Sequence, residues 1–355
     1  MSNQFASVPG SPAPGSLCTT LARLWQSGRD GLRAVFLQPI ELLLKRKATQ
    51  QTARARLFTN RRELCRGSQD LVQTARRCWE FAAGNSPFPY DVAMQLIQLN
   101  GCRLEVRQIA GSQRLAPLVF LHEGLGSVSF WTQRGLDWPQ AVCQATGRAG
   151  VVFSRRGYGR SEPMAAGRDQ LQPDYMHHEA WVVLPALLEQ LQIQSPVLVG
   201  HSDGATIALL YASRLPVSAC VAMAPHVLVE NIALQAIAAA KVAFETTDPA
   251  SGGLRGRLAR GHADVDGAFW QWNDVWLSEG FRSFDIRSDC SRITAPLLLI
   301  QGRDDAYGTM AQLDEIALAT PHAEQLRLAD CGHSPQRDQP TLTTNAVRDF
   351  LLNIL

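Results

Sequence analysis

The chain has 355 residues, of which 46% are hydrophobic and 19% charged, so it is long enough to bury a sizeable core. Its formal net charge of +2 argues against nucleic acid or a membrane surface as the main partner. No run of about 18 apolar residues occurs, which argues against a transmembrane helix. The eight cysteines are scattered without a C-x-x-C pair, which argues against a disulfide framework or a zinc site and favours a reducing, cytoplasmic compartment.

Residues 1–92 differ in composition from the rest of the chain. Residues 2–16 are rich in Pro, Gly and Ser, which is typical of disordered chain. A basic stretch follows in which Asp and Glu are sparse, and residues 63–81 have helical character. We interpret 1–92 as a basic N-terminal extension, partly disordered or helical. Three roles stay open: an accessory helical arm, an organelle-targeting sequence, or an extension that does not contribute to the fold.

From Tyr90 onward, short apolar runs alternate with helical segments. Residues 94–99 and 104–109 flank Asn100-Gly101, a strong β-hairpin signal. The further predicted strands are 118–121, 150–153, 197–199, 217–224 and 297–300. The predicted helices are 175–191, 205–215, 310–319 and 342–355. Because continuous apolar runs are typical of strands covered on both faces, this pattern predicts an α/β domain over 93–355, with a mostly parallel sheet and helices on both faces.

The interval at about 226–292 interrupts this alternation. It lacks a strand-like run, and it contains an alanine-rich helical stretch, 232–244, and a cluster of aromatic residues that includes Trp270 and Trp272. Because the interval is too long for a plain connection, we expect an inserted helical cap. Packing within that cap is the ordinary role of such tryptophans, while one or both of Trp270 and Trp272 are candidate substrate contacts.

A candidate nucleophile lies in the G-x-S-x-G segment from Gly200 to Gly204, whose central residue is Ser202. An apolar strand precedes the segment and a helix-forming stretch follows it. A sharp strand-to-helix turn holds a serine oxygen clear of the backbone, and glycines leave room where chain segments crowd together. The five-residue pattern alone also fits an ordinary Gly-rich turn, and the strand and helix beside it make the catalytic interpretation specific.

A serine hydroxyl needs a base, and the base needs an orienting acid. Downstream, the strand at 297–300 runs into Asp304 and Asp305, and the strand region at 326–328 precedes Gly332-His333. Both turns are expected at the carboxyl ends of neighbouring strands, where active sites of open α/β sheets lie. We therefore predict Asp305 as the acid, with Asp304 as the alternative, and His333 as the base.

Acyl transfer also requires donors for the developing oxyanion. We expect one from the backbone N–H of Asp203, the residue after the nucleophile, and one from Gly124 in the loop after the strand at 118–121. Leu125 is the alternative donor and a candidate substrate contact. Arg155, which follows the strand at 150–153, is a candidate contact for an acidic substrate group.

Five segments in this order resemble the α/β-hydrolase superfamily, in the group with a helical cap after the sixth strand: 122–126, 156–161, 200–204, 302–305 and 332–333. The resemblance covers about the last three-quarters of the chain. It implies an eight-stranded sheet, catalysis without a cofactor or metal, and the triad Ser202, Asp305 and His333. Two positions depart from the family: Glu123 stands where a glycine is usual, and Asp203 stands where a neutral residue is more usual.

The expected function is hydrolysis of a small carboxylic ester, thioester or lactone through an acyl-enzyme. The alternatives are a carbon–carbon bond hydrolase of a ring-fission diketone in aromatic degradation, and a ligand-binding receptor on the same fold. The expected partner is a small-molecule substrate, with no nucleic acid and no membrane, and the chain is expected as a monomer or homodimer.

Overall fold

The computed structural model describes residues 94–164, 171–246 and 252–354, so the predicted extension at 1–92 lies outside the described residues. The strands are β1 (Met94–Leu99), β2 (Cys102–Ile109), β3 (Leu118–Leu121), β4 (Thr132–Gln133), β5 (Leu136–Asp137), β6 (Gly150–Phe153), β7 (Val197–His201), β8 (Ala219–Met223), β9 (Leu297–Gly302) and β10 (Glu324–Leu328). None of the described helices combines the length and the hydropathy needed to cross a bilayer.

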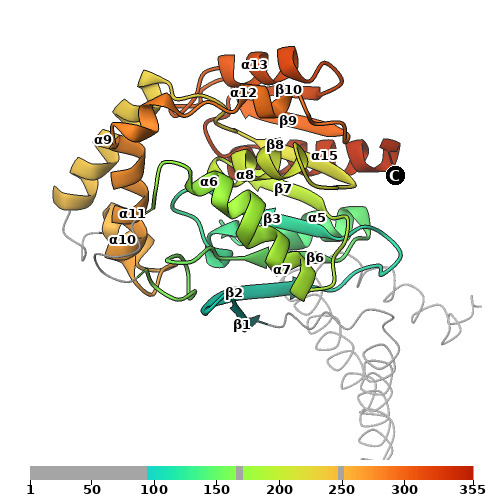
Figure 1. The fold of residues 1–355 in the computed structure, drawn as a ribbon, viewed down its shortest axis with the longest axis horizontal. Coiled ribbons are helices and arrows are strands. Elements are labelled where there is room, and N and C mark those ends of the chain that lie inside the picture. Colours follow the sequence, from blue (N-terminus) through green and yellow to red (C-terminus); the bar gives the residue numbers. More distant parts are fainter. Residues whose placement is uncertain (1–93, 165–170, 247–251, 355) are drawn as a thin grey trace, which may run out of the picture. The chain divides into compact units, whose positions relative to one another are not determined.

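Eight strands form one sheet in the order β1-β2-β6-β3-β7-β8-β9-β10, which confirms the predicted mostly parallel sheet (Figure 1). The pairs β1–β2 and β2–β6 are antiparallel, and the remaining pairs are parallel. The predicted hairpin turn joins β1 to β2, with Asn100 at φ 49° and Gly101 at φ 84°, a backbone conformation that favours Asn-Gly. β4 and β5 form a separate two-stranded ribbon.

The helices that flank the sheet differ in length, from one turn to four. They are η3 (Val128–Trp131), α5 (Trp138–Thr146), α6 (Tyr175–His178), the π-helical η4 (Glu179–Val183), α7 (Leu184–Gln190), α8 (Asp203–Ala212), α12 (Arg287–Cys290), α13 (Ala311–Ala319), α14 (Pro335–Asp338) and α15 (Pro340–Ile354). The helix predicted at 175–191 is therefore continuous in sequence but includes a π-helical segment.

Two hydrophobic clusters lie on opposite faces of the sheet. In β3, Val119 and Leu121 belong to the cluster with α6, α7 and α8, while Leu118 and Phe120 belong to the cluster with α5 and α15. Successive side chains of a strand point to opposite faces, so a strand covered on both faces is apolar at every position. The continuous apolar runs of the central strands have this physical cause.

Between β8 and β9 lie α9 (Asn231–Thr246), α10 (Leu254–Leu258), α11 (Val265–Leu277) and η6 (Gly280–Ser283). We refer to α9, α10 and α11 as the cap helices, and Figure 1 shows them together at one side of the sheet. Phe244 of α9 stacks on Phe269 of α11, with ring centroids 3.8 Å apart. This stacking packs α9 against α11.

Candidate active site

Ser202 lies at the sharp turn between β7 and α8, with φ 54° and ψ −120°. This strained conformation is held by close packing on both sides of the turn. A Cβ atom at Gly200 would lie 2.2 Å from the Gly204 carbonyl oxygen, and one at Gly204 would lie 2.1 Å from the Leu121 carbonyl oxygen. Only glycine fits at either position, which accounts for both glycines of the motif.

Ser202, His333 and Asp305 form one hydrogen-bonded chain. The Ser202 Oγ lies 2.9 Å from His333 Nε2. The His333 Nδ1 lies 2.8 and 2.9 Å from the two carboxylate oxygens of Asp305. Because an ionised carboxylate only accepts hydrogen bonds, Nδ1 carries the proton and donates a hydrogen bond to Asp305. Nε2 of the neutral ring is then free to accept the proton of the serine hydroxyl.

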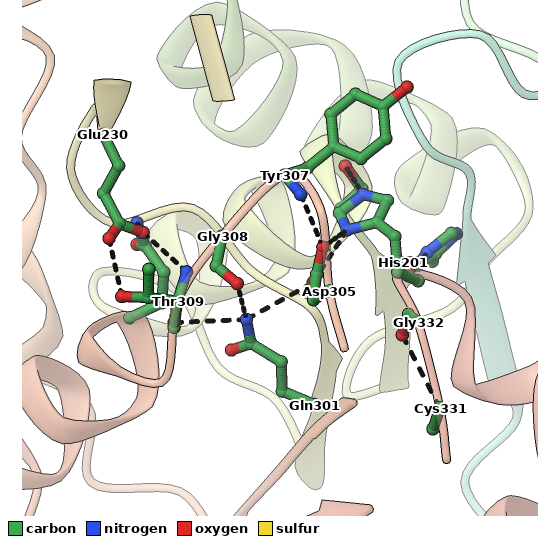
Figure 2. Close-up of polar contacts among 12 residues, drawn as sticks. His201, Glu230, Gln301, Asp305, Tyr307, Gly308, Thr309, Cys331 and Gly332 are labelled. Carbon is green, nitrogen blue, oxygen red and sulfur yellow. Dashed lines mark hydrogen bonds and ion pairs between the residues drawn. The ribbon is translucent and has the colours of Figure 1, made fainter. Parts of the chain in front are cut away.

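The end of β9 and the loop after it fix the carboxylate of Asp305, as Figure 2 shows. The Tyr307 backbone N–H donates to Asp305 Oδ1 at 2.8 Å, and Gln301 Nε2 lies 3.3 Å from Oδ2. Burial alone would raise the pKa of Asp305, but the hydrogen bonds from His333 and Tyr307 outweigh it and leave the pKa below its ordinary value. Asp304, the alternative acid, is exposed, whereas Asp305 is buried.

A second contact in Figure 2 ties this loop to the segment that leads into the cap helices. The carboxylate of Glu230, just before α9, accepts from the Thr309 backbone N–H at 2.9 Å and from the Thr309 hydroxyl at 2.6 Å. Gln312 Nε2 donates to the same carboxylate at 2.7 Å. The loop that carries Asp305 and the segment that leads into α9 are therefore held together by charge-assisted hydrogen bonds.

A sequence profile described as the alpha/beta hydrolase family matches residues 118–346, a span that contains the whole Ser202–His333–Asp305 chain. The chain is an α/β-hydrolase.

This α/β-hydrolase is similar to the putative carbamate hydrolase RutD of Pseudomonas syringae pv. syringae (strain B728a), at 27% identity over 66% of this chain and 94% of that protein. It is also similar to the sn-1-specific diacylglycerol lipase ABHD11 of Mus musculus, at 25% identity over 70% of this chain and 85% of that protein. Among solved structures, the enol-lactonase from Burkholderia xenovorans LB400 superposes with a TM-score of 0.56 and 20% identity over 73% of this chain and 100% of that one. The structural likeness shows a shared fold.

The predicted oxyanion donors of this α/β-hydrolase lie on two segments that touch each other. Asp203 is the first residue of α8, so its backbone N–H has no acceptor within the helix. The loop with Gly124 follows β3, the neighbour of β7 in the sheet. The close approach of Gly204 to the Leu121 carbonyl brings the two segments together.

The Asp203 side chain is buried and makes contacts of its own. Tyr175 donates its hydroxyl proton to Asp203 Oδ2 at 2.5 Å, and Arg155 Nη2 lies 3.6 Å from the same oxygen. Burial raises the pKa of Asp203 above its ordinary value, and Arg155 and the Tyr175 hydrogen bond oppose that shift. Arg155, considered above as a contact for a substrate acid, is itself buried against Asp203, with only 3% of its side chain exposed.

Glu123, the other departure from the family pattern, contacts the residue before the nucleophile. Its Oε2 lies 3.3 Å from His201 Nδ1. Burial tends to raise the pKa of Glu123, but the contact with His201 outweighs burial and lowers the pKa to about 2. The His201 Nε2–H donates to the backbone carbonyl of His333 at 2.7 Å. Glu123 and His201 thus connect the loop after β3, which carries Gly124, to the backbone of the predicted base.

The two candidate tryptophans occupy different places. A Cβ atom at Gly124 would lie 2.2 Å from the Nε1 of Trp272, so this buried indole packs directly on the loop after β3. Trp270 contacts Phe244 and Phe269 within the cap helices, and none of its ring contacts among the described residues is with the triad. The Leu125 carbonyl accepts from His262 Nε2 at 3.0 Å.

Two histidines near the site were not predicted. His226, just after β8, has its ring centroid 5.6 Å from that of His333 and 5.0 Å from that of Trp276. His262, between α10 and α11, accepts from the Gly159 N–H at 2.9 Å and so links the cap to the loop after β6. The only sequence signal for His226 was its place directly after a predicted strand, and His262 carried none.

Proposed function

We propose that this α/β-hydrolase is a serine hydrolase that cleaves a small carboxylic ester, thioester or lactone through an acyl-enzyme. The observation that carries the proposal is the unbroken hydrogen-bonded path from Ser202 through His333 to Asp305, with Ser202 on a strained turn. Side chains in that arrangement can activate a hydroxyl that is otherwise a poor nucleophile.

In the acylation step, Ser202 Oγ attacks the substrate carbonyl carbon while His333 Nε2 takes the hydroxyl proton. The imidazolium formed is stabilised by the buried carboxylate of Asp305. The carbonyl oxygen gains a negative charge, and it accepts hydrogen bonds from the backbone N–H groups of Asp203 and Gly124. Collapse of the tetrahedral intermediate breaks the bond to the leaving group, which receives the proton from His333.

In the deacylation step, a water molecule gives a proton to His333 and attacks the acyl carbon. The same two N–H groups hold the second oxyanion. When this intermediate collapses, the bond to Ser202 Oγ breaks, the proton returns from His333 to the serine, and the carboxylic acid leaves. Each step begins with neutral His333 in the tautomer that the Asp305 contacts favour.

The substrate class is supported by the carbonyl chemistry that this machinery performs and by the names of the similar proteins. A carbamate, a diacylglycerol and an enol-lactone, which those names print, all present a carbonyl carbon bearing a leaving oxygen or nitrogen. A panel of short p-nitrophenyl esters, thioesters, lactones, carbamates and a ring-fission diketone therefore spans the candidates.

The proposal is tested by steady-state turnover of that panel with three proteins: wild type, Ser202→Ala and Ser195→Ala. Ser195 is an exposed serine outside the site and serves as the matched control. We expect turnover of at least one carbonyl substrate, a loss of about 10⁶-fold in kcat for Ser202→Ala, and wild-type rates for Ser195→Ala. Wild-type rates in Ser202→Ala would overturn the proposal.

The two alternatives are outcomes of the same panel. A carbon–carbon bond hydrolase would cleave the ring-fission diketone with a kcat/KM far above that of any ester. A ligand-binding receptor would release at most one equivalent of p-nitrophenol per protein molecule and then stop.

A further inference from the structure

The backbone carbonyl of Glu123, in the loop after β3, accepts three hydrogen bonds. His122 Nδ1–H donates to it at 2.7 Å, Arg155 Nη2 at 3.0 Å and the Gly126 N–H at 3.0 Å. A turn needs only one donor on this oxygen, which here is the Gly126 N–H. The carbonyl oxygen has two lone pairs, and it accepts from two side chains in addition. One of the donors is a guanidinium, which makes stronger hydrogen bonds than a neutral group.

The same peptide unit carries the Gly124 N–H. Because the peptide bond is planar and trans, its C=O and N–H point in opposite directions, and holding the oxygen fixes the direction of the N–H. Donors on the oxygen also polarise the peptide, which strengthens the N–H as a donor. The contacts at Glu123 O therefore aim and strengthen the N–H of Gly124.

Arg155 holds this peptide in two ways. Its side chain reaches the Glu123 carbonyl, and its backbone N–H donates to His122 Nε2 at 3.0 Å. With Nε2 as acceptor, His122 must be the neutral Nδ1–H tautomer, which is the form that donates to Glu123. Burial, and next the charge of Arg155, lower the pKa of His122 well below its ordinary value, in keeping with a neutral ring.

The same guanidinium touches the other side of the oxyanion site. Its Nη2 lies 3.6 Å from Asp203 Oδ2, and the two side chains are 3% and 1% exposed. Asp203 supplies the second proposed N–H from the start of α8, and Tyr175 fixes its carboxylate from α6. Arg155 therefore bridges the two segments whose separation determines the size of the oxyanion site.

We propose that Arg155 is a positioning residue for the oxyanion hole: it orients the Gly124 N–H through the Glu123 carbonyl and sets its place relative to Asp203. The inference rests on the proposed function, because it assumes that these N–H groups receive the oxyanion. The inference also explains why an aspartate stands at position 203: its carboxylate holds the Arg155 guanidinium beside the loop after β3.

A purely structural role predicts a different outcome. If Arg155 only neutralises the buried Asp203, removing both charges together should restore activity. If Arg155 acts on the Glu123 carbonyl, the double variant should fold well and still react slowly. Arg155→Met, and Arg155→Met combined with Asp203→Asn, separate the two. Arg107→Met is the matched control, because Arg107 is another buried arginine paired with an aspartate, Asp137, outside the site.

The readout is the ratio of kcat/KM for a p-nitrophenyl ester to that for its thiono analogue, in which C=S replaces C=O. Sulfur is larger and accepts hydrogen bonds weakly, so a well-formed oxyanion site favours the oxygen ester. Deleting one oxyanion donor costs about 10²–10³ in kcat, so misdirecting one should cost about 10- to 100-fold. We expect that loss in kcat, at similar KM, and a parallel fall of the ratio, in both Arg155 variants and not in Arg107→Met.

An unchanged ratio in a folded Arg155 variant, or wild-type kcat in the double variant, would overturn the inference. The double variant keeps the test decisive if Arg155→Met alone does not fold. Failure of the proposed function is a separate result, because it would appear as an absence of Ser202-dependent turnover in the wild-type protein.

Discussion

Replacing Gly124 with alanine tests the proposed oxyanion donor at a crowded point of the loop after β3. The added Cβ would lie 2.2 Å from Trp272 Nε1 and 2.4 Å from Cδ1 of the same indole. Ordinary contact needs about 3.5 Å, so loop and indole must separate by about 1.3 Å. The indole is 6% exposed and packs edge-on against Phe269, so its neighbours limit how far it can move away from the loop. The loop must therefore take up much of the shift.

A displacement of about 1 Å at a catalytic group can cost about 10² in rate, so we expect kcat of Gly124→Ala to fall about 100-fold. Stability should fall by about 1–3 kcal/mol, the ordinary cost of overpacking. The assay is p-nitrophenyl ester turnover together with urea unfolding. Gly150→Ala is the matched control, because its Cβ would lie 2.5 Å from Cys143 Sγ at the amino end of β6. It should lose stability and keep kcat.

Combining Gly124→Ala with Trp272→Ala removes the group that the new methyl meets. The double variant should recover at least about tenfold in kcat over Gly124→Ala, measured as a coupling against both single variants. Near-normal kcat in a folded Gly124→Ala, or a double variant no better than the single, would refute the reasoning that this loop carries an oxyanion donor.

Two further predictions concern the acid and a buried histidine. Asp305→Asn should lower kcat about 10⁴-fold with little loss of stability, because the amide favours the wrong His333 tautomer. Asp304→Asn should keep wild-type kcat, and the reverse pattern in the same assay would reassign the acid. Burial, and next the charge of His333, lower the pKa of His226 to about 3. Between about pH 6.5 and 3 the unfolded chain therefore binds a proton at His226 that the native state does not, and the free energy of unfolding decreases as pH falls. Between pH 7 and pH 5 this decrease amounts to about 2 kcal/mol. Urea unfolding at the two pH values should therefore show a decrease in the free energy of unfolding that is about 2 kcal/mol smaller in His226→Gln than in the wild type. Equal decreases in the two proteins would contradict the prediction.

The sheet was predictable because its central strands are covered on both faces and so carry unbroken apolar runs. The hairpin at Asn100-Gly101 was predictable because few other residue pairs adopt φ 49° and 84° readily. Helix α5 was not predicted, although Asp137 caps it through the Gln140 N–H and Pro139 follows within its first turn. That capping signal spans only a few residues of the sequence.

Ser202, Asp305 and His333 were named from local context, and the structure brings the three side chains into contact; their catalytic role stays a prediction. The surroundings of the triad were not predictable in the same way. The contacts of Arg155 with Glu123 and Asp203 join three segments far apart in the sequence. Such contacts follow from the order of strands in the sheet, which no local pattern specifies.

The central claim, that Ser202 forms the covalent intermediate, is tested most directly by trapping it. Turnover of a p-nitrophenyl ester is quenched with acid, and the protein is digested and its peptides are analysed by mass spectrometry. We predict one acyl group on the peptide that contains Ser202, with slower loss of that group in His333→Ala. An acyl group on another residue, or steady turnover with an unmodified Ser202 under every quench time, would contradict the account.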